Sequence, residues 1–202
     1  MRDPYVTARV AEAAVLGGAK GLRVNGVEDI EAVRAVTQVP IIGLFKVPGD
    51  RRPIITPTLE HAEALVRAGA DIVAIDCSDE VRGGNLGIVA SVRETLGVPV
   101  MADVSTLLEG TRAWTSGAEL VGTTLSGYTP ETAGTGEEPD LALVTHLAGA
   151  GVRVVAEGRI RTPEDVAAAF SAGAYSVVVG GAITDPLKTT ELFSRATPSR
   201  AL

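Results

Sequence analysis

A Gly-Ala pair followed by an apolar, β-rich run recurs four times and constrains the fold more than any other feature of the chain. The pairs stand at Gly18-Ala19, Gly69-Ala70, Gly117-Ala118 and Gly173-Ala174, separated by 51, 48 and 56 residues. Each interval has room for two strand-helix units, because helices of about ten residues alternate with the apolar runs. Four such double units predict an α/β fold, the (β/α)₈ or TIM barrel of eight parallel strands inside a ring of helices.

Only seven apolar runs have the composition of strands. They cover residues 19–25, 39–46, 71–76, 98–103, 119–123, 153–157 and 175–180. The first repeat opens instead on a helix, which Asp3-Pro4 caps and Gly17-Gly18 ends. We therefore expect a TIM barrel of the phosphate-binding type that lacks its first β-strand. An open, doubly wound sheet is the alternative, but no G-x-G-x-x-G follows any run.

The segments between the runs are expected to be helices or loops. Thr56-Pro57 has the pattern of a helix cap followed by proline, and it predicts a helix that continues to Ala68. A last helix is expected at 189–195. Loops are expected at 47–53, 78–84 and 124–140, and the long polar segment 124–140 is of a kind that is often functional in compact domains.

Composition narrows the class of protein and its partners. The chain is 46% apolar and 21% charged, so we expect residues 1–202 to form one domain with a loose tail at 196–202. A net charge of −7 disfavours binding to nucleic acid or to an anionic membrane. One cysteine, Cys77, no signal region and no membrane-length apolar run predict a cytoplasmic protein. The sequence does not decide between a monomer and a homodimer.

Polar side chains mark the C-terminal ends of the apolar runs, where barrels of this type have their active sites. The run 154–160, V-V-A-E-G-R-I, is the clearest case, because a buried strand ends there on a carboxylate, a glycine and an arginine. The candidate site residues at the run ends are Arg23, Lys46, Asp76, Asp103, Thr124 and Glu157.

Two glycine-containing loops follow the last two runs and predict a phosphate-binding site. They are Gly158-Arg159 and Gly180-Gly181. Glycine lets phosphate approach the backbone N–H groups closely, and Arg159 is suited to neutralise the phosphate charge. The expected ligand is therefore a small phosphorylated molecule.

Each candidate also has a structural interpretation. Lys46 is either a solvated lysine or a desolvated amine that acts as a base or a Schiff-base nucleophile. Glu157 either takes part in the chemistry or forms an ion pair with Arg159 or Arg161. The carboxylates Asp76 and Asp103 either anchor loops or contact ligand, and Arg23 either pairs with one of them or binds ligand.

No metal site or cofactor is expected. A metal held by Asp76, Asp103 and Glu157 is disfavoured, because the two histidines, His61 and His146, fall on helices expected at the surface of the barrel. Cys77 is expected to be a small buried residue rather than a nucleophile, since no histidine is placed to activate it.

Six segments in order along nearly the whole chain resemble the N-acetylmannosamine-6-phosphate 2-epimerase family. They are G-L-R-V-N-G-V-E-D-I (21–30), P-I-I-G-L-F-K (40–46), I-T-P-T (55–58), M-A-D-V-S-T (101–106), G-T-T-L-S-G-Y-T (122–129) and A-E-G-R-I (156–160). The resemblance implies an isomerase that interconverts N-acetylmannosamine 6-phosphate and N-acetylglucosamine 6-phosphate in sialic acid breakdown, without a cofactor. It also implies that Lys46 is the catalytic base and Glu157 its acidic partner, while Arg23 and Asp103 hold the sugar.

The chemistry of such an epimerase agrees with the candidate residues. Inverting C2 beside an open-chain aldehyde requires removal of an acidified carbon proton and its return to the other face through an enolate. A lysine kept partly neutral by burial and by a cationic neighbour can do this near pH 7. Glu157 would assist ring opening or protonate oxygen, and Arg23 would stabilise the developing negative charge.

The chain departs from the family pattern in three places. No counterpart of the family's first strand, which carries a substrate-facing glutamine, precedes Met1. Asp185 stands where the family often has arginine in its I-T-R-P motif, and only Arg82 remains of several arginines after Asp76.

Two other classes of function compete with the epimerase. A phosphosugar decarboxylase is disfavoured, because its D-x-K-x-x-D cluster would require acids where Leu44 and Gly49 stand, and a metal-dependent ketose epimerase is disfavoured by the lack of strand-end histidines. A degenerate barrel that binds a phosphosugar as a sensor is the alternative outside enzymes.

Overall fold

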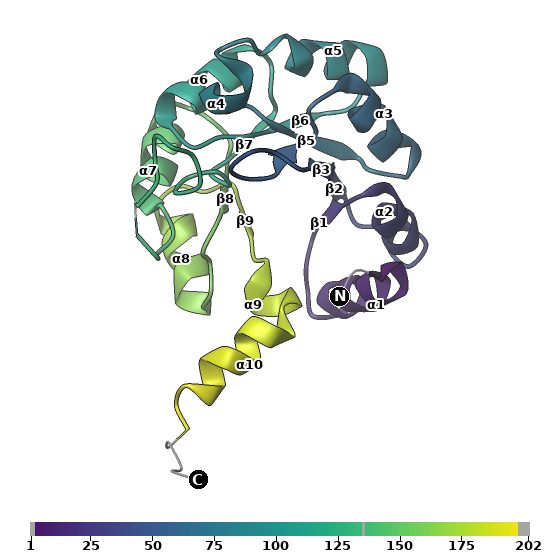
Figure 1. Cartoon of the computed structure of the whole chain (residues 1–202), viewed down its shortest axis with the longest axis vertical. Helices are drawn as coiled ribbons and strands as arrows, with labels where there is room; N and C mark the ends of the chain where they lie inside the picture. Colours follow the sequence, from purple (N-terminus) through teal and green to yellow (C-terminus); the bar gives the residue numbers. More distant parts are fainter. Residues whose placement is uncertain (1–2, 135, 198–202) are drawn as a thin grey trace.

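Seven parallel strands form one curved sheet in the computed structural model, which describes residues 3–134 and 136–197 (Figure 1). Their spatial order is β1 (Leu22–Asn25), β2 (Ile41–Leu44), β5 (Ile72–Asp76), β6 (Val100–Asp103), β7 (Leu120–Gly122), β8 (Val154–Glu157) and β9 (Ser176–Val178). Every adjacent pair is parallel. The expected α/β barrel of seven strands is confirmed.

Helices surround the sheet on its outer side (Figure 1). The surrounding helices of eight or more residues are α1 (Pro4–Leu16), α2 (Val27–Arg34), α3 (Leu59–Arg67), α5 (Gly87–Leu96), α6 (Leu107–Thr115), α7 (Leu141–Gly149) and α8 (Pro163–Ser171), while α10 (Pro186–Ser194) projects away from the barrel (Figure 1). Several begin at a side-chain cap that the sequence supplies. Asp3 caps α1, and the pairs Thr106/Glu109 and Thr162/Asp165 form reciprocal capping boxes at α6 and α8.

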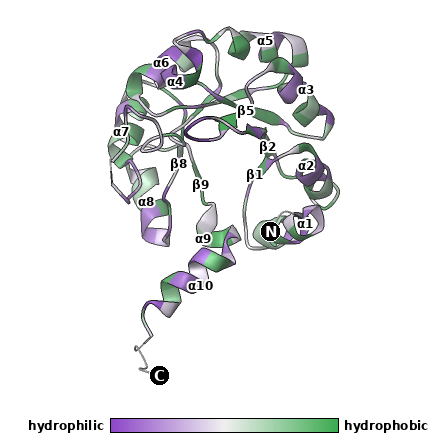
Figure 2. Ribbon diagram, in the orientation of Figure 1, coloured by the Kyte–Doolittle hydropathy of each residue, from purple (hydrophilic) through white to green (hydrophobic). Residues whose placement is uncertain are grey.

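Two separate apolar cores lie on the two faces of the sheet. The outer core fills the space between strands and helices, with Ile30 of α2, Leu65 of α3 and Val73 of β5 fully buried. The inner core lies inside the barrel, where Ala74 and Met101 are fully buried. Figure 2 shows hydrophobic strands such as β5 surrounded by helices that carry both hydrophobic and hydrophilic residues. The period of two along each strand therefore decides which side chains face the barrel interior.

The sheet does not close into a complete ring among the described residues. β1 and β9 stand at its two ends, and each pairs on one side only, β1 with β2 and β9 with β8. All three residues of β9 are half-buried, whereas every residue of β6 is buried. Figure 1 shows the opening between these two end strands.

Several expected boundaries in the first half of the chain are wrong. The helix expected from Thr56-Pro57 begins at Leu59, and Thr58 caps it. Thr56 is buried and has a left-handed backbone conformation, with φ of 47°. Its N–H donates to the carbonyl of Phe45, and its hydroxyl accepts from the N–H of Phe45. Thr56 therefore fastens the end of a loop rather than the start of a helix.

The strand expected at 39–46 is divided. β2 ends at Leu44, and Lys46 belongs to a small antiparallel ribbon of β3 (Lys46–Val47) and β4 (Ile54–Ile55), which brackets the expected loop. The chain turns between them because the Phe45 ring points outward against His61 of α3, with ring centroids 4.7 Å apart. The strands expected at 19–25 and 175–180 are also shorter than predicted.

Three helices, α4, α9 and α10, differ from the prediction. The expected loop 78–84 contains α4 (Asp79–Arg82). The last helix, expected at 189–195, is α10 (Pro186–Ser194), which begins three residues earlier, and the short helix α9 (Gly181–Thr184) before it was not predicted. The signal for the earlier start is Asp185-Pro186, because Asp185 caps α10 by accepting from the N–H of Lys188 at 3.1 Å. Of the tail expected at 196–202, residues 198–202 lie outside the described part of the chain.

No helix in the described part of the chain has the length and apolarity needed to cross a bilayer.

Removing the Glu109 carboxylate from the capping box of α6 should cause a measurable loss of stability. Glu109 is buried and accepts hydrogen bonds from the N–H groups of Asp79, Ser105 and Thr106 and from the hydroxyl of Ser105. Glu109→Ala leaves these donors without an acceptor and should lower the free energy of unfolding by about 3 kcal/mol in urea denaturation. The control Glu164→Ala, at an exposed first-turn position of α8, should lower it by less than about 1 kcal/mol. A similar small loss for both variants would contradict the role of Glu109.

Candidate active site

The alternation of side chains along the strands directs the candidate residues into the barrel. Met101 and Val155 belong to the inner core, so Asp103 and Glu157, two positions later, face the same side. In β1, Val24 packs in the outer core, and Arg23 and Asn25 therefore face inward. The sequence pattern of strand-end polar residues is thus converted into one polar cluster at the C-terminal end of the sheet.

Arg23, Asp103 and Glu157 form a buried ion cluster at that end. One terminal nitrogen of Arg23, Nη1, donates to Oε1 of Glu157, and the other, Nη2, donates to Oδ2 of Asp103. The side chains of Arg23 and Asp103 are 7% and 0% exposed, so the cluster is almost fully shielded from solvent. Of the interpretations open from the sequence, Arg23 pairs with two strand-end carboxylates, and Glu157 pairs with Arg23 rather than with Arg159 or Arg161.

Thr124 completes the cluster from the end of β7. Its hydroxyl donates to Oδ1 of Asp103 at 2.7 Å and lies 3.5 Å from Nη1 of Arg23. A glycine makes room for this contact, because a Cβ on Gly122 would lie 2.3 Å from Cε of Met101 and 2.9 Å from the Thr124 hydroxyl. Thr123 holds the neighbouring strand, since its hydroxyl bonds to both the N–H and the carbonyl of Glu157, at 3.0 and 2.9 Å.

Burial and the uneven charge count control protonation in the cluster. Burial raises the pKa of Asp103 to about 7; Arg23 opposes this rise, and the nearby Glu157 carboxylate adds to it. Burial alone would lower the pKa of Arg23, but Asp103 and Glu157 outweigh burial and the pKa is raised. Arg23 therefore stays cationic, while Asp103 exchanges its proton near neutral pH.

Two polar atoms of the cluster make no hydrogen bond within the described structure. They are Oε2 of Glu157 and Nε of Arg23, and both are buried. Buried polar atoms in folded proteins are normally paired, because an unpaired one costs about 1–3 kcal/mol. A carboxylate oxygen and a guanidinium N–H are thus available to a ligand with hydroxyl or carbonyl groups.

Lys46 stands above this cluster on the ribbon rather than at the end of β2. Its side chain is exposed, and its backbone N–H donates to Oδ1 of Asn25 at 2.9 Å. Across the ribbon Lys46 pairs directly with Ile55, which packs in the inner core, so the side chain of Lys46 lies on the face of the ribbon toward the barrel interior. The structure thus brings a cationic side chain to the same end of the sheet as the buried cluster.

Asp76 has a different neighbour from the other strand-end carboxylates. It is fully buried, and Arg52 donates to it twice, at 2.6 and 3.3 Å, while the hydroxyl of Ser78 donates at 2.6 Å. Arg52 also pairs with Glu80. Arg52 was not among the predicted site residues, because its only signal in the sequence is a charged loop, G-D-R-R-P, that ends in a proline.

Arg82 also holds loops in place. It donates to the carbonyls of Asp76, Pro57 and Thr56, at 2.7, 3.0 and 3.3 Å. The arginine that remains after Asp76 thus binds backbone carbonyls of its own chain.

The predicted phosphate-binding residues occupy the loops after β8 and β9. Gly158 has φ of 108°, a conformation that suits glycine, and Gly180 and Gly181 are exposed at the start of α9. Arg159 donates to the carbonyls of Ser126 and Glu138, at 2.7 and 2.6 Å. Its guanidinium also lies 5.7 Å from the ring centre of Tyr128. Arg159 therefore fastens the long 124–140 segment over the end of β8.

The histidines and the cysteine lie outside the cluster. His146 is exposed on α7, while His61 is only half-buried on α3 because Phe45 packs against its ring. Cys77 is buried, and burial raises the pKa of its thiol, so it is held as a neutral side chain. Within residues 3–134 and 136–197, no group of three or more metal-ligating side chains comes together.

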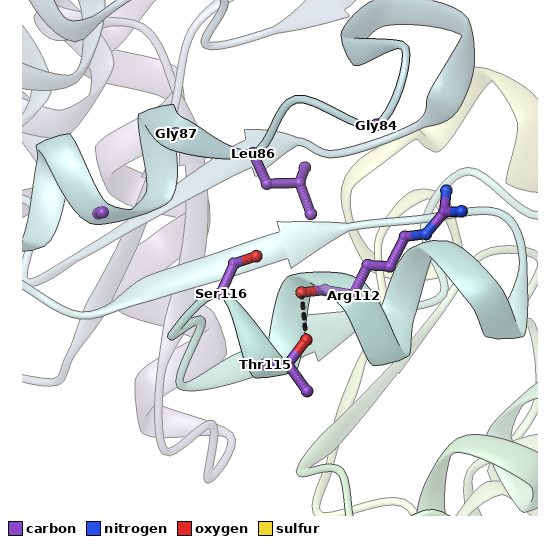
Figure 3. Close-up of a pocket in the computed structure, with 7 residues that line it drawn as sticks. Gly84, Leu86, Gly87, Arg112, Thr115 and Ser116 are labelled. Carbon is purple, nitrogen blue, oxygen red and sulfur yellow. Dashed lines mark hydrogen bonds between the residues drawn. The ribbon is translucent and has the colours of Figure 1, made fainter.

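A cavity of about 490 Å³ lies on the flank of the barrel, between α5, α6 and the loop before α5. Arg112, Thr115 and Ser116 line it from α6 and its C-terminus, and Figure 3 shows Leu86 facing them. None of the strand-end candidates belongs to this cavity. The cluster at the end of the sheet, rather than this flank, carries the groups suited to chemistry.

Comparison with known proteins identifies the family to which the chain belongs. A family model, NanE, described as "Putative N-acetylmannosamine-6-phosphate epimerase", matches residues 7–199. The chain belongs to the NanE family. The resemblance found in the sequence motifs is thereby confirmed.

Individual NanE relatives cover most of the chain. A "Putative N-acetylmannosamine-6-phosphate 2-epimerase" of Yersinia pestis (strain Pestoides F) is 49% identical over 186 residues, which are 91% of this chain and 78% of the relative. A protein of the same description from Klebsiella pneumoniae is 46% identical over 183 residues, 90% and 77% of the two chains. The structure of the N-acetylmannosamine-6-phosphate 2-epimerase from Clostridium perfringens superposes with a TM-score of 0.89 at 36% identity, over 97% of this chain and 87% of that one.

The raised pKa of Asp103 predicts that the stability of this NanE chain depends on pH. An aspartate in the unfolded chain releases its proton near pH 4, whereas Asp103 keeps its proton to about pH 7. Between these values the native state binds more protons than the unfolded state, so the free energy of unfolding should fall as the pH rises. Asp103→Asn, which does not titrate, should flatten this fall in urea denaturation between about pH 4.5 and 7.5. The exposed control Asp50→Asn should keep the wild-type slope, and an Asp103→Asn slope equal to wild type would disprove the assignment.

The pair of Arg52 and Asp76 predicts a loss of stability when its cation is removed. Arg52→Met leaves a fully buried carboxylate without its counter-ion and should lower the free energy of unfolding by about 3 kcal/mol. The neighbouring exposed arginine gives a matched control, Arg51→Met, with an expected change below about 0.5 kcal/mol. The double variant Arg52→Met/Asp76→Asn should recover part of the loss. Unchanged stability together with a raised KM in Arg52→Met would instead assign Asp76 and Arg52 to the ligand.

Proposed function

We propose that this chain is an isomerase that interconverts N-acetylmannosamine 6-phosphate and N-acetylglucosamine 6-phosphate. The observation that carries the proposal is the buried cluster of Arg23, Asp103 and Glu157 at the strand ends, with Lys46 above it, in a chain of the NanE family. We take the substrate from the relatives, which are described as N-acetylmannosamine-6-phosphate 2-epimerases. The reaction belongs to amino-sugar catabolism and requires no cofactor.

Lys46 is the base in this proposal. The C2 proton of the open-chain sugar is acidified by the adjacent aldehyde, so the amine can remove it to leave an enolate and an ammonium. Inversion then requires the enolate to turn its other face toward the ammonium before the proton returns to C2. Lys46 is exposed, as in the solvated alternative from the sequence, so in this proposal the bound sugar displaces water from around the amine before it acts as a base. The Schiff-base alternative is not needed for an inversion at C2.

In this proposal the buried cluster transfers a proton to or from the sugar oxygens and stabilises the negative charge on them. Glu157 has one buried oxygen, Oε2, with no partner in the described structure, and this atom is suited to exchange a proton with the ring or carbonyl oxygen during ring opening. Arg23 remains cationic beside it and stabilises the negative charge that develops on the enolate oxygen. Asp103 and Thr124 hold the guanidinium and offer further contacts to the sugar hydroxyls.

The phosphate of the substrate is proposed to bind at the loops after the last two strands. Gly158, Gly180 and Gly181 leave the backbone N–H groups accessible there, and the short helix α9 begins at Gly181. Phosphate sites of barrels of this type are often built from these loops and a short extra helix. Arg159 supports the site by fastening the neighbouring loop, and Asp76 supports it only indirectly, through Arg52.

The proposed partner is therefore a small phosphorylated amino sugar, not nucleic acid or a membrane. A net charge of −7 supports this choice of partner. The single cysteine, which is buried and free, fits a reducing compartment and supports the proposed cytoplasmic location. The sequence does not decide between a monomer and a homodimer, and light scattering distinguishes the two.

Hydrogen exchange at C2 tests the proposed function. The purified chain, incubated with N-acetylmannosamine 6-phosphate in D₂O, should incorporate deuterium at C2 while the gluco epimer appears in the proton NMR spectrum. Lys46→Ala should lower the rate by at least about 1,000-fold and leave ligand binding largely intact, because the step that fails is proton transfer. The control Lys20→Ala, at an exposed position outside the cluster, should exchange like wild type.

The other outcomes of this experiment separate the alternatives. Binding without exchange in the wild-type chain would favour the phosphosugar sensor over the enzyme. Full exchange in Lys46→Ala would refute the role of Lys46 and leave Glu157 as the remaining candidate base.

A further inference from the structure

The side chain of Asn25 supports the backbone of Lys46. Asn25 ends β1, is half-buried, and faces the barrel interior two residues after Arg23. Its Oδ1 accepts the N–H of Lys46 at 2.9 Å across 21 residues of sequence. Neither the strand-end pattern nor the family motifs give Asn25 this role.

The backbone of β1 cannot supply this acceptor. The ladder between β1 and β2 ends where the N–H of Gly26 donates to the carbonyl of Leu44 at 2.9 Å, and the next residue of the first segment, Val27, begins α2. The chain then turns out at Phe45, whose backbone is fastened to Thr56. The backbone N–H of Lys46 therefore points back toward β1, where the side-chain oxygen of Asn25 takes the place of a backbone carbonyl acceptor.

Asn25 also connects Lys46 to the ion cluster. Arg23, on the same face of the same short strand, binds Asp103 and Glu157, and Asn25 binds Lys46. One four-residue strand thus carries both the contacts to the carboxylates and the contact to the Lys46 backbone. Because the lysine side chain is long, a shift of its Cα by about 1 Å is carried to the amine, and misplacement of this size can cost about 100-fold in rate.

We propose that Asn25 is a positioning residue for Lys46, and this rests on the proposed function of Lys46 as the base. Asn25 holds the ribbon so that the amine stands over C2 of a sugar bound to the cluster. The side-chain oxygen does this work as an acceptor, so a carboxylate at the same place retains the contact and an apolar side chain of similar size loses it.

The test compares two substitutions of similar size at this position. Asn25→Leu should lower kcat by about 10- to 100-fold with KM changed by less than about threefold, because sugar binding is retained while the base is misplaced. Asn25→Asp, which keeps an acceptor oxygen, should recover most of this loss. The control Asn85→Ala removes the other asparagine, whose Oδ1 accepts the N–H of Gly87 at 3.1 Å outside the site, and it should leave kcat unchanged. Equal losses of kcat in Asn25→Leu and Asn25→Asp, or a rise in KM alone, would overturn the proposal.

Amide hydrogen exchange at Lys46 decides the question independently of turnover. Its N–H should exchange at least about tenfold faster in Asn25→Leu than in wild type or in Asn25→Asp, since the acceptor is gone. Unchanged protection would refute the positioning role even if activity fell. If the wild-type chain did not turn over the sugar, the proposed function would fail, while the support of Lys46 by Asn25 would still stand or fall on this exchange rate.

Discussion

The buried guanidinium of Arg23 is the interaction on which the end of the barrel depends. It comes from β1, at one end of the sheet, and binds carboxylates on β6 and on β8, the strand next to the other end. A buried charge is costly unless it is paired, so the cation and the carboxylates are stable only together. Arg23 thereby links strands that do not pair with each other, across the interior of a sheet whose end strands each pair on one side only.

The sequence predicted where polar groups would lie but not which would bind one another. The rule that active sites follow the strand ends placed Arg23, Asp103 and Glu157 together, because the ends of the apolar runs are a local pattern. The pairing of Asp76 with Arg52 was missed, since it joins a strand to an irregular loop, and no periodicity specifies a loop's path. Asn25 was missed for the same reason.

The boundary errors at the barrel mouth have one physical origin. Thr56-Pro57 has a helix-start pattern, yet Thr56 adopts a left-handed conformation, because its backbone and hydroxyl hold Phe45 in the turn. Because the chain turns at Phe45, Lys46 lies on the ribbon and not at the end of β2. Tertiary hydrogen bonds thus outweighed local propensity at the point where the proposed base leaves the barrel wall. Elsewhere, where capping boxes and Gly-Ala junctions agreed with the packing, the order of strands and helices followed the sequence closely.

The separation of Lys46 from the carboxylates follows from these constraints. Arg23 already neutralises one negative charge of Asp103 and Glu157, and burial raises the pKa of Asp103 to about 7, so the cluster can balance its own charge near neutral pH. A lysine inside the cluster would instead form an ion pair that holds its proton and would make a poor base. By placing Lys46 on an exposed ribbon, fastened through its backbone to Asn25, the chain keeps the amine free of an ion pair, so that a bound sugar and not the cluster determines its surroundings.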